Sequence, residues 1–137
     1  YLVKLDTNDT RPRVIGELLM DNLVDFIAMD IKGPLEKYVQ IAARPIDLAA
    51  IQQSIALIKA MAGHEFRTTI VRTQLAVDDF EQIGQMVRGA KRYALQRFVS
   101  QGALVSSQFV HAESFTDDEL AAAQHIMQKY VTECVVH

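Results

Sequence analysis

The sequence predicts an α/β fold in which the strands of one parallel sheet alternate with helices. Short runs rich in β-branched residues alternate with longer stretches whose apolar residues recur at helical spacing. Capping residues stand before several of the helical stretches, and glycines stand after them. Such alternation implies parallel strands joined by right-handed crossovers, and therefore one sheet with no internal domain boundary.

Five strands are expected, each a short run of apolar and β-branched residues. They cover residues 2–7, 24–31, 65–71, 92–99 and 134–136. Four helices are expected between them, and their start signals, in chain order, are Pro12, Asp47, Asp78 and the capping-box pair Thr116 and Glu119. Gly63 ends the second helix and Gly89 ends the third, whereas residues 35–45 are expected to form an irregular loop.

Length and composition limit the class of protein. Half of the 137 residues are hydrophobic, which is enough for the core of one domain. The formal charge of -3 gives no reason to expect a nucleic-acid partner. No apolar run approaches the roughly 18 residues that a membrane span needs, and no signal peptide is visible. The chain opens at Tyr1 inside a strand-like segment, so we expect that an amino-terminal portion of a longer parent is missing.

Cysteine, histidine and serine give little sign of chemistry. The single cysteine, Cys134, excludes an internal disulfide and a cysteine-only metal site within this chain, and it fits a reducing cytoplasm. The histidines lack the spacing that would put two ligands on one helix face. Ser106 and Ser107 have no neighbouring acid–base pair in the sequence. We therefore predict neither a histidine metal site nor a serine nucleophile.

Charged residues gather on one predicted face of the sheet. Alternate side chains of a strand point to opposite faces, so Asp30 shares a face with Lys32, and Asp6 shares one with Asn8. An open doubly wound sheet has helices on both faces, where unpaired charges are costly. A curved, partly open (βα) barrel has a solvated rim instead. We therefore favour the arc of a barrel over the doubly wound sheet.

The first two strands end in residues that suit a binding site. They close with Asp6 and Thr7, and with Asp30 and Lys32. Sequential strands usually lie about 5 Å apart, so the two carboxylates would repel each other. A hard cation between them, or a lysine bridging to an anionic ligand, would resolve that repulsion. The alternative is a surface ion pair of Asp30 with Lys32, with Asp6 as an ordinary turn carboxylate.

Two further polar residues lie on the third and fourth strands. The guanidinium of Arg67 could clamp a carboxylate or a ribose-linked group. Alternatively, Arg67 neutralises Glu65 or Asp30, which is the commoner role of such a residue. Gln96 offers both a donor and an acceptor, and it is equally consistent with a polar group of the core.

Three segments resemble the radical S-adenosylmethionine (SAM) activating proteins. They are VKLDTNDTRPRVIGELLMDNLVDFIAMDIKGPLEKY, EFRTTIV and YALQRFVSQGALV. The closest resemblance is to the proteins that activate anaerobic ribonucleoside-triphosphate reductase, and the pyruvate formate-lyase activating enzymes are related. The resemblance implies a partial (βα)6 TIM-like barrel, of which residues 1–137 form the carboxy-terminal portion as a single domain. The family's CxxxCxxC loop, which binds a 4Fe–4S cluster, is absent, and Cys134 cannot replace it.

The resemblance also implies roles for individual residues. Asp6, Thr7, Asp30 and the backbone at Ala28 resemble a monovalent-cation site beside the methionine carboxylate of SAM. Lys32 resembles the lysine that approaches this carboxylate, and Arg67 the arginine near the ribose or the carboxylate. Asn8 is the remaining cofactor-site residue of the motif, although the family's usual TNG turn is Thr7-Asn8-Asp9 here. No catalytic residue and no iron–sulfur ligand is expected in this chain.

The function implied for the intact parent is the activation of a glycyl radical enzyme of the anaerobic ribonucleotide reductase or pyruvate formate-lyase type. Reductive cleavage of SAM would give a radical that takes a hydrogen atom from a glycine of that partner. The chain alone is predicted to be inactive, and its exposed sheet edges and apolar concave face are expected to favour homo-oligomers. Two alternatives remain: a non-catalytic half-barrel binding module, and a barrel enzyme in which Lys32 forms a Schiff base.

Overall fold

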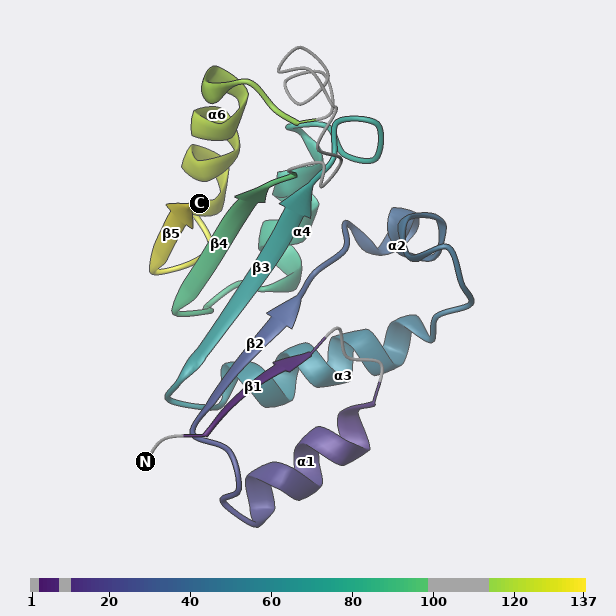
Figure 1. The fold of residues 1–137 in the computed structure, drawn as a ribbon, viewed down its shortest axis with the longest axis vertical. Helices are drawn as coiled ribbons and strands as arrows, with labels where there is room; N and C mark the ends of the chain where they lie inside the picture. The colour runs from purple at the N-terminus through teal and green to yellow at the C-terminus, as the bar shows by residue number, and fades with distance from the viewer. Residues whose placement is uncertain (1–2, 8–10, 99–113) are drawn as a thin grey trace, which may run out of the picture.

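The computed structural model describes residues 3–7, 11–98 and 114–137. Its sheet has five parallel strands in the order β1-β2-β3-β4-β5 (Figure 1). The elements in chain order are β1 (Lys4–Thr7), α1 (Pro12–Met20), β2 (Phe26–Asp30), α2 (Leu35–Ala42), α3 (Leu48–Lys59), β3 (His64–Ile70), α4 (Asp79–Met86), β4 (Arg92–Arg97), α6 (Asp117–Met127) and β5 (Glu133–Val136). The predicted α/β class and the alternation of strands with helices are confirmed.

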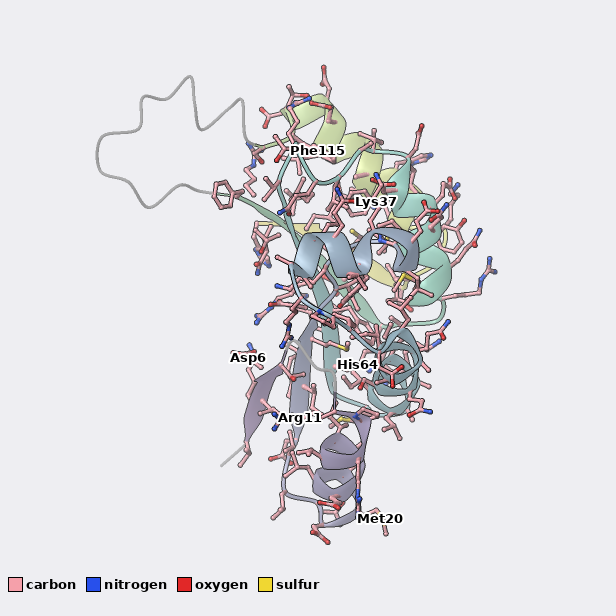
Figure 2. The ribbon with its side chains drawn as sticks, turned by 90° about the vertical axis from the view of Figure 1, so that its right-hand side faces the viewer. Asp6, Arg11, Met20, Lys37, His64 and Phe115 are labelled. Carbon is pink, nitrogen blue, oxygen red and sulfur yellow. The ribbon has the colours of Figure 1, made fainter. Side chains whose placement is uncertain are left out.

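The strand order follows the chain, without the reversal that defines a doubly wound sheet. Right-handed crossovers that always step in the same direction put their helices on the same face of a sheet. Figure 2 shows this arrangement edge-on: the helices lie to the right of the strands, and Asp6 lies on the left. Within the described residues, one face of the sheet is therefore covered by helices and the other is not.

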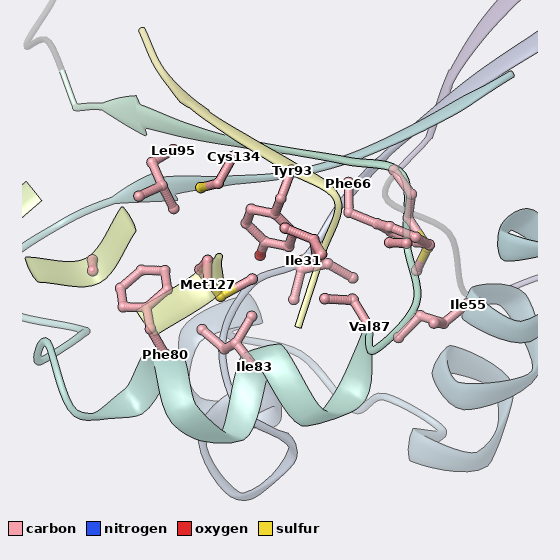
Figure 3. Packing of buried hydrophobic residues seen from close by; sticks show 14 of the residues in the cluster. Ile31, Ile55, Phe66, Phe80, Ile83, Val87, Tyr93, Leu95, Met127 and Cys134 are labelled. Atoms are coloured by element: carbon pink, nitrogen blue, oxygen red, sulfur yellow. The ribbon is translucent and has the colours of Figure 1, made fainter. Parts of the chain in front are cut away.

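The core lies between the sheet and the helices that cover it (Figure 3). Alternate residues of β2 enter it, and Ile27, Met29 and Ile31 are at most 1% exposed. Phe66 and Tyr93 extend the same layer across β3 and β4. Helix side chains complete it, among them Ile55, Phe80, Ile83, Leu120 and Met127. The alternation predicted from the sequence thus separates a buried apolar face of the sheet from a polar one.

The capping signals of α3 and α6 act as the sequence predicts. The Asp47 carboxylate accepts hydrogen bonds from the backbone N–H groups of Ala49 and Ala50 at the start of α3. The Thr116 side chain and Glu119 form both halves of a capping box at the start of α6. These bonds satisfy helix N–H groups that have no partner inside the helix.

The prediction of an irregular loop over residues 35–45 is wrong, because Leu35–Ala42 form α2. The helix begins directly after Pro34 and ends at Ala43, which has a positive φ of 57°. Tyr38 is buried on its inner side, and Lys37 forms an ion pair with Asp79 of α4 at 2.7 Å. Burial of its apolar side stabilises α2, although the helix is short and lies between Pro34 and Pro45.

Gly63 does not end α3, which stops at Lys59. The glycine lies instead where two chain segments approach each other closely. A Cβ atom at this position would come within 2.6 Å of the backbone oxygen of Asp25. Gly63 is therefore needed for the contact between the start of β3 and the start of β2.

None of the helices in the described segments combines the length and the apolar character that a membrane span requires.

Candidate functional site

A small polar pocket lies at the ends of β1 and β2, next to the middle of β3. It has a volume of about 370 Å³ and is lined by Asp6, Thr7, Asp30 and Arg67. All four residues are among those predicted from the sequence. The three strands are adjacent in the sheet, so their polar side chains meet at one place. The expected convergence of charged residues from neighbouring strands is thus observed.

Arg67 is the centre of this group. Its Nε atom lies 2.7 Å from Oδ1 of Asp30 and donates a hydrogen bond to it. Its Nη2 atom lies 3.6 Å from Oδ1 of Asp6. The strand register explains the first contact, because Asp30 and Arg67 are direct partners in the β2–β3 pair. Both carboxylates therefore lie on one face of the sheet and share one guanidinium.

The ionisation of Arg67 reflects these contacts. The hydrogen bond with Asp30 raises the pKa of the Arg67 guanidinium, while partial burial acts in the opposite direction. The charges of Asp6 and Glu65 raise it further. The arginine thus stays fully charged and neutralises carboxylates that would otherwise repel each other.

Lys32 forms an ion pair with the carboxylate oxygen of Asp30 that does not bond to Arg67. Its Nζ atom is 3.9 Å from Oδ2 of Asp30. Lys32 and Asp30 both line a second pocket of about 320 Å³. Asp30 also lines the first pocket. The walls of the second pocket are half apolar and half polar. The apolar residues are Ile31, Ile41, Val71 and Phe98, and the polar ones besides Asp30 and Lys32 are Thr69 and Gln74.

The contacts of Asp30 bear on the alternatives drawn from the sequence. The ion pair of Asp30 with Lys32 is present, and Arg67 neutralises Asp30, as the simpler interpretations expect. The sequence led us to expect a bound cation that relieves the repulsion between Asp6 and Asp30. The guanidinium of Arg67 contacts both carboxylates and supplies that positive charge. Within the described residues, no group of three or more His, Cys, Asp or Glu residues is arranged to hold a metal ion. Repulsion between the carboxylates therefore does not by itself require a bound cation.

Ala28 and Gln96 lie apart from the ion pairs of Arg67. Ala28 is fully buried in β2 and is the register partner of Asp6. Asn8 lies outside the described residues. The polar residue Gln96 is close to Thr69, whose hydroxyl donates to its Oε1 atom at 3.4 Å, away from the Arg67 group.

A second row of charges crosses the same face of the sheet, and the sequence analysis missed it. Arg92 of β4 donates to Glu65 of β3 at 2.7 Å and to Glu133 of β5 at 3.1 Å. The signal was present, because Glu65 stands two residues before Arg67 on the same side of β3. The expectation of an apolar concave face is therefore wrong for the described residues: ion pairs cover much of this face.

Cys134 lies in β5 on the side of the core. Burial raises the pKa of its thiol to about 12, so the sulfur stays protonated at neutral pH. A thiolate is the form that binds iron, and the sequence contains no other cysteine. The residues of this chain therefore do not fit a 4Fe–4S cluster.

Comparison with known proteins gives one informative relative. The chain is 32% identical over 141 residues to a protein of Methanocaldococcus jannaschii named a putative glycyl-radical enzyme activating enzyme. The similarity covers 99% of this chain but only 58% of the relative. No protein-family model matches the chain. The similarity supports the resemblance to radical SAM activating proteins, without distinguishing among their subfamilies.

Proposed function

We propose that this chain is the carboxy-terminal portion of a radical SAM enzyme that activates a glycyl radical enzyme. The observation that carries the proposal is the 32% identity over 99% of the chain to a protein named for that activity. The sheet order agrees with it, since five parallel strands in sequence order are what an arc of a (βα) barrel would have. Residues 1–137 would form one domain of the barrel.

The charges of the pocket suit the amino-acid end of SAM. That end carries a carboxylate and an ammonium group next to a sulfonium. Asp6 and Asp30 supply carboxylates within reach of one pocket, and Arg67 and Lys32 supply cationic donors beside them. Such a set can hold both charges of a zwitterion, because each sign of the ligand meets its opposite. We assign Thr7, Asn8 and the Ala28 backbone to the same site, with a monovalent cation as an additional ligand.

The reaction requires more than this chain provides. Bound SAM would supply a hydrogen-abstracting 5'-deoxyadenosyl radical: one electron from an external cluster would break the C5'–S bond of the sulfonium, with methionine as the leaving group. The residues described here would bind and orient SAM, and they hold no cluster. The partner would be a glycyl radical enzyme of the anaerobic ribonucleotide reductase or pyruvate formate-lyase type. We predict no SAM cleavage above the buffer rate by the chain alone.

Titration calorimetry of the 137-residue chain with SAM tests the proposal. We expect saturable binding, weakened about tenfold or more by Asp30→Asn, because a charged hydrogen-bond acceptor is lost. Glu133→Gln is the matched control, since Glu133 lies on the same face but outside the pocket. Absence of binding by the folded wild type, or equal weakening by both variants, would contradict the proposed site.

The sequence upstream of Tyr1 in the reading frame tests the enzyme assignment separately. We expect this upstream sequence to encode a CxxxCxxC motif, which would supply the cluster ligands. A frame that lacks these cysteines would contradict the assignment even if SAM binds.

A second candidate is a non-catalytic binding module that uses the uncovered face. It is favoured by the observation that the charges of this face pair with one another. Failure of the SAM titration in a folded chain would support it. The Schiff-base alternative fits less well, because Lys32 is half-exposed beside a carboxylate and not enclosed in an apolar pocket.

A further inference from the structure

Two buried hydroxyl groups hold the end of β2 from the side of the core. Thr68 of β3 is 1% exposed, and its Oγ1 atom donates to the backbone oxygen of Ile31 at 2.7 Å. Tyr93 of β4 is fully buried, and its hydroxyl is hydrogen-bonded to the same Thr68 oxygen. Figure 3 shows the Tyr93 ring inside the core next to Ile31. A connected pair of side chains therefore reaches the backbone that follows Asp30.

This bond lies where the regular pairing of β2 with β3 ends. The last backbone bond between them runs from the Ile31 N–H to the Arg67 oxygen, at 2.7 Å. The Ile31 carbonyl then accepts from the Thr68 hydroxyl, and the chain leaves the sheet toward α2 (Figure 1). Thr68 thus fixes the point at which the two strands separate, next to the pocket that Asp30, Lys32 and Thr69 line.

The direction of these hydrogen bonds follows from the Ile31 carbonyl, which is the last acceptor of the series. A carbonyl oxygen can only accept, so the Thr68 hydroxyl donates to Ile31, and Tyr93 donates to Thr68. Burial raises the pKa of the Tyr93 hydroxyl, which keeps its proton available for donation. Hydrogen bonds arranged in such a series strengthen one another in a buried environment.

A third hydroxyl is hydrogen-bonded to the backbone oxygen of Asp30, the residue before Ile31. The Tyr38 hydroxyl of α2 donates to the backbone oxygen of Asp30 at 3.4 Å. The carbonyls of Asp30 and Ile31 are thus both held by side chains from the core. The Asp30 and Lys32 side chains meanwhile reach pockets at the end of the sheet.

We infer that Thr68, supported by Tyr93, is a positioning residue that sets the Asp30 and Lys32 side chains against Arg67 and against the ligand. The inference rests on the proposed function for the identity of the ligand, which is SAM. The Thr68 hydroxyl is hydrogen-bonded to the Ile31 backbone and to Tyr93, so its effect on Asp30 and Lys32 is transmitted through the backbone of the strand end.

Thr68→Val tests the inference, because valine keeps nearly the shape of threonine and puts a methyl group in place of the hydroxyl that bonds to Ile31 and Tyr93. Amide hydrogen exchange then compares two amides of the same strand. The Ile31 N–H lies at the supported end, and the Ile27 N–H, bonded to Gly63 at 3.2 Å, lies at the other end. We expect protection at Ile31 to fall about tenfold more than at Ile27, as expected for one lost hydrogen bond. Thr68→Ser should restore it.

Ser54→Ala is the matched control, since Ser54 in α3 is a buried hydroxyl that has no hydrogen-bond partner among the described residues. It should leave the ratio of the two protections unchanged. SAM affinity should fall about tenfold in Thr68→Val and recover in Thr68→Ser. Equal loss of protection at Ile31 and Ile27 would show a merely structural role and overturn the inference. If the wild type binds no SAM, the proposed function fails, and the exchange ratio still decides the role of Thr68.

Discussion

At the scale of single residues, Arg67 determines how two carboxylates can share a face of the sheet. It hydrogen-bonds to Asp30 and lies within 3.6 Å of Asp6, and its side chain is 22% exposed. We predict that Arg67→Met lowers the free energy of unfolding by about 1–3 kcal/mol, because the charged hydrogen bond to Asp30 and the ion pair with Asp6 are lost. Urea denaturation at neutral pH measures this change.

Arg13 provides the matched control for Arg67. It forms an i,i+4 ion pair with Glu17 in α1, but its side chain is 92% exposed. Arg13→Met should change stability by less than about 0.5 kcal/mol. A similar loss in both variants would mean that the shared guanidinium contributes nothing beyond an ordinary surface pair.

His64 connects two backbone segments through its ring. Its Nδ1 atom donates to the Met61 carbonyl at 2.8 Å, and its Nε2 atom accepts from the Lys91 N–H at 3.0 Å. The residue is buried at the start of β3. His64→Leu leaves both backbone groups without a partner, and we predict a loss of stability of about 2–4 kcal/mol, measured by thermal or urea unfolding.

The exposed His125 of α6 is the control for that variant. His125→Leu should change stability by no more than about 0.5 kcal/mol, because the side chain fills no core position. If His64→Leu unfolds with the wild-type free energy, the two ring contacts do not stabilise the fold.

At the scale of elements, the contact of α4 with the segment after α6 depends on a missing side chain. A Cβ atom at Gly84 would come within 2.2 Å of the Tyr130 ring. A Cβ atom at Gly16 of α1 would meet no atom of the described segments within 4 Å. We predict that Gly84→Ala destabilises the protein by about 1–3 kcal/mol through overpacking, and that Gly16→Ala stabilises it by up to about 1 kcal/mol.

Chemical denaturation of the two glycine variants gives a comparison with opposite expected signs. Both changes add the same methyl group inside a helix, so helix propensity alone predicts stabilisation in each. Equal stabilisation by the two variants would show that Tyr130 moves aside without cost.

The start of α6 is held by a residue from the loop after β3. Arg72 forms a two-pronged ion pair with Glu119 and donates to the Ser114 carbonyl at 3.3 Å. The bond from Arg72 holds the pKa of Glu119 below its ordinary value of 4.5, and the Thr116 N–H lowers it further. This contribution to stability is therefore present above about pH 4.5 and is lost as the pH falls through the lower, folded-state pKa.

A pH series of unfolding free energies tests this linkage. We expect the decline of stability below about pH 4.5 to be shallower in Glu119→Gln than in the wild type. Arg72→Gln should flatten it as well, because Arg72 is the main cause of the shift. Slopes that match the wild type in both variants would refute the assignment.

The elements that the sequence could predict were those with local signals. Capping residues marked α3 and α6, and β-branched runs marked the strands. The helix α2 was missed because Gly33-Pro34 and Pro45 made its surroundings look like a loop. The helical spacing of Leu35, Tyr38 and Ile41 was a usable signal, but burial of Tyr38 against the sheet depends on tertiary packing.

The sequence was sufficient to expect that charged residues of neighbouring strands meet on one face of the sheet, and it left the ion pairs that they form as alternatives. Alternation along strands was enough to place Asp6, Asp30 and Arg67 on one face. It could not show that Arg67 would bridge both carboxylates, because this depends on strand register and side-chain reach. The supporting hydroxyl of Thr68 was also missed, since nothing local distinguishes it from a packing threonine.

At the scale of the whole molecule, exposed apolar side chains gather near one edge of the sheet. Within the described residues β1 is an edge strand, and Val3, Met20 and Leu23 near β1 and α1 are 42%, 84% and 55% exposed. We predict concentration-dependent self-association of the chain, because an open strand edge beside apolar surface favours pairing. Light scattering coupled to size exclusion measures it.

The double variant Met20→Lys with Leu23→Lys should shift that equilibrium toward the monomer. Val39→Lys is the control, because Val39 is 45% exposed on α2. A wild-type chain that stays monomeric at high concentration would contradict the expectation of homo-oligomers.

The order of strands along the sheet also has a consequence for folding. Among the described residues, each strand pairs with the strands next to it in the chain, from Lys4 with Phe26 in β1 and β2 to Arg92 with Glu133 in β4 and β5. Each pairing closes a loop between consecutive strands, and the entropy cost of closing a loop grows only slowly with its length. Assembly can therefore start at any neighbouring pair and spread outward, strand by strand, without rethreading what has already formed.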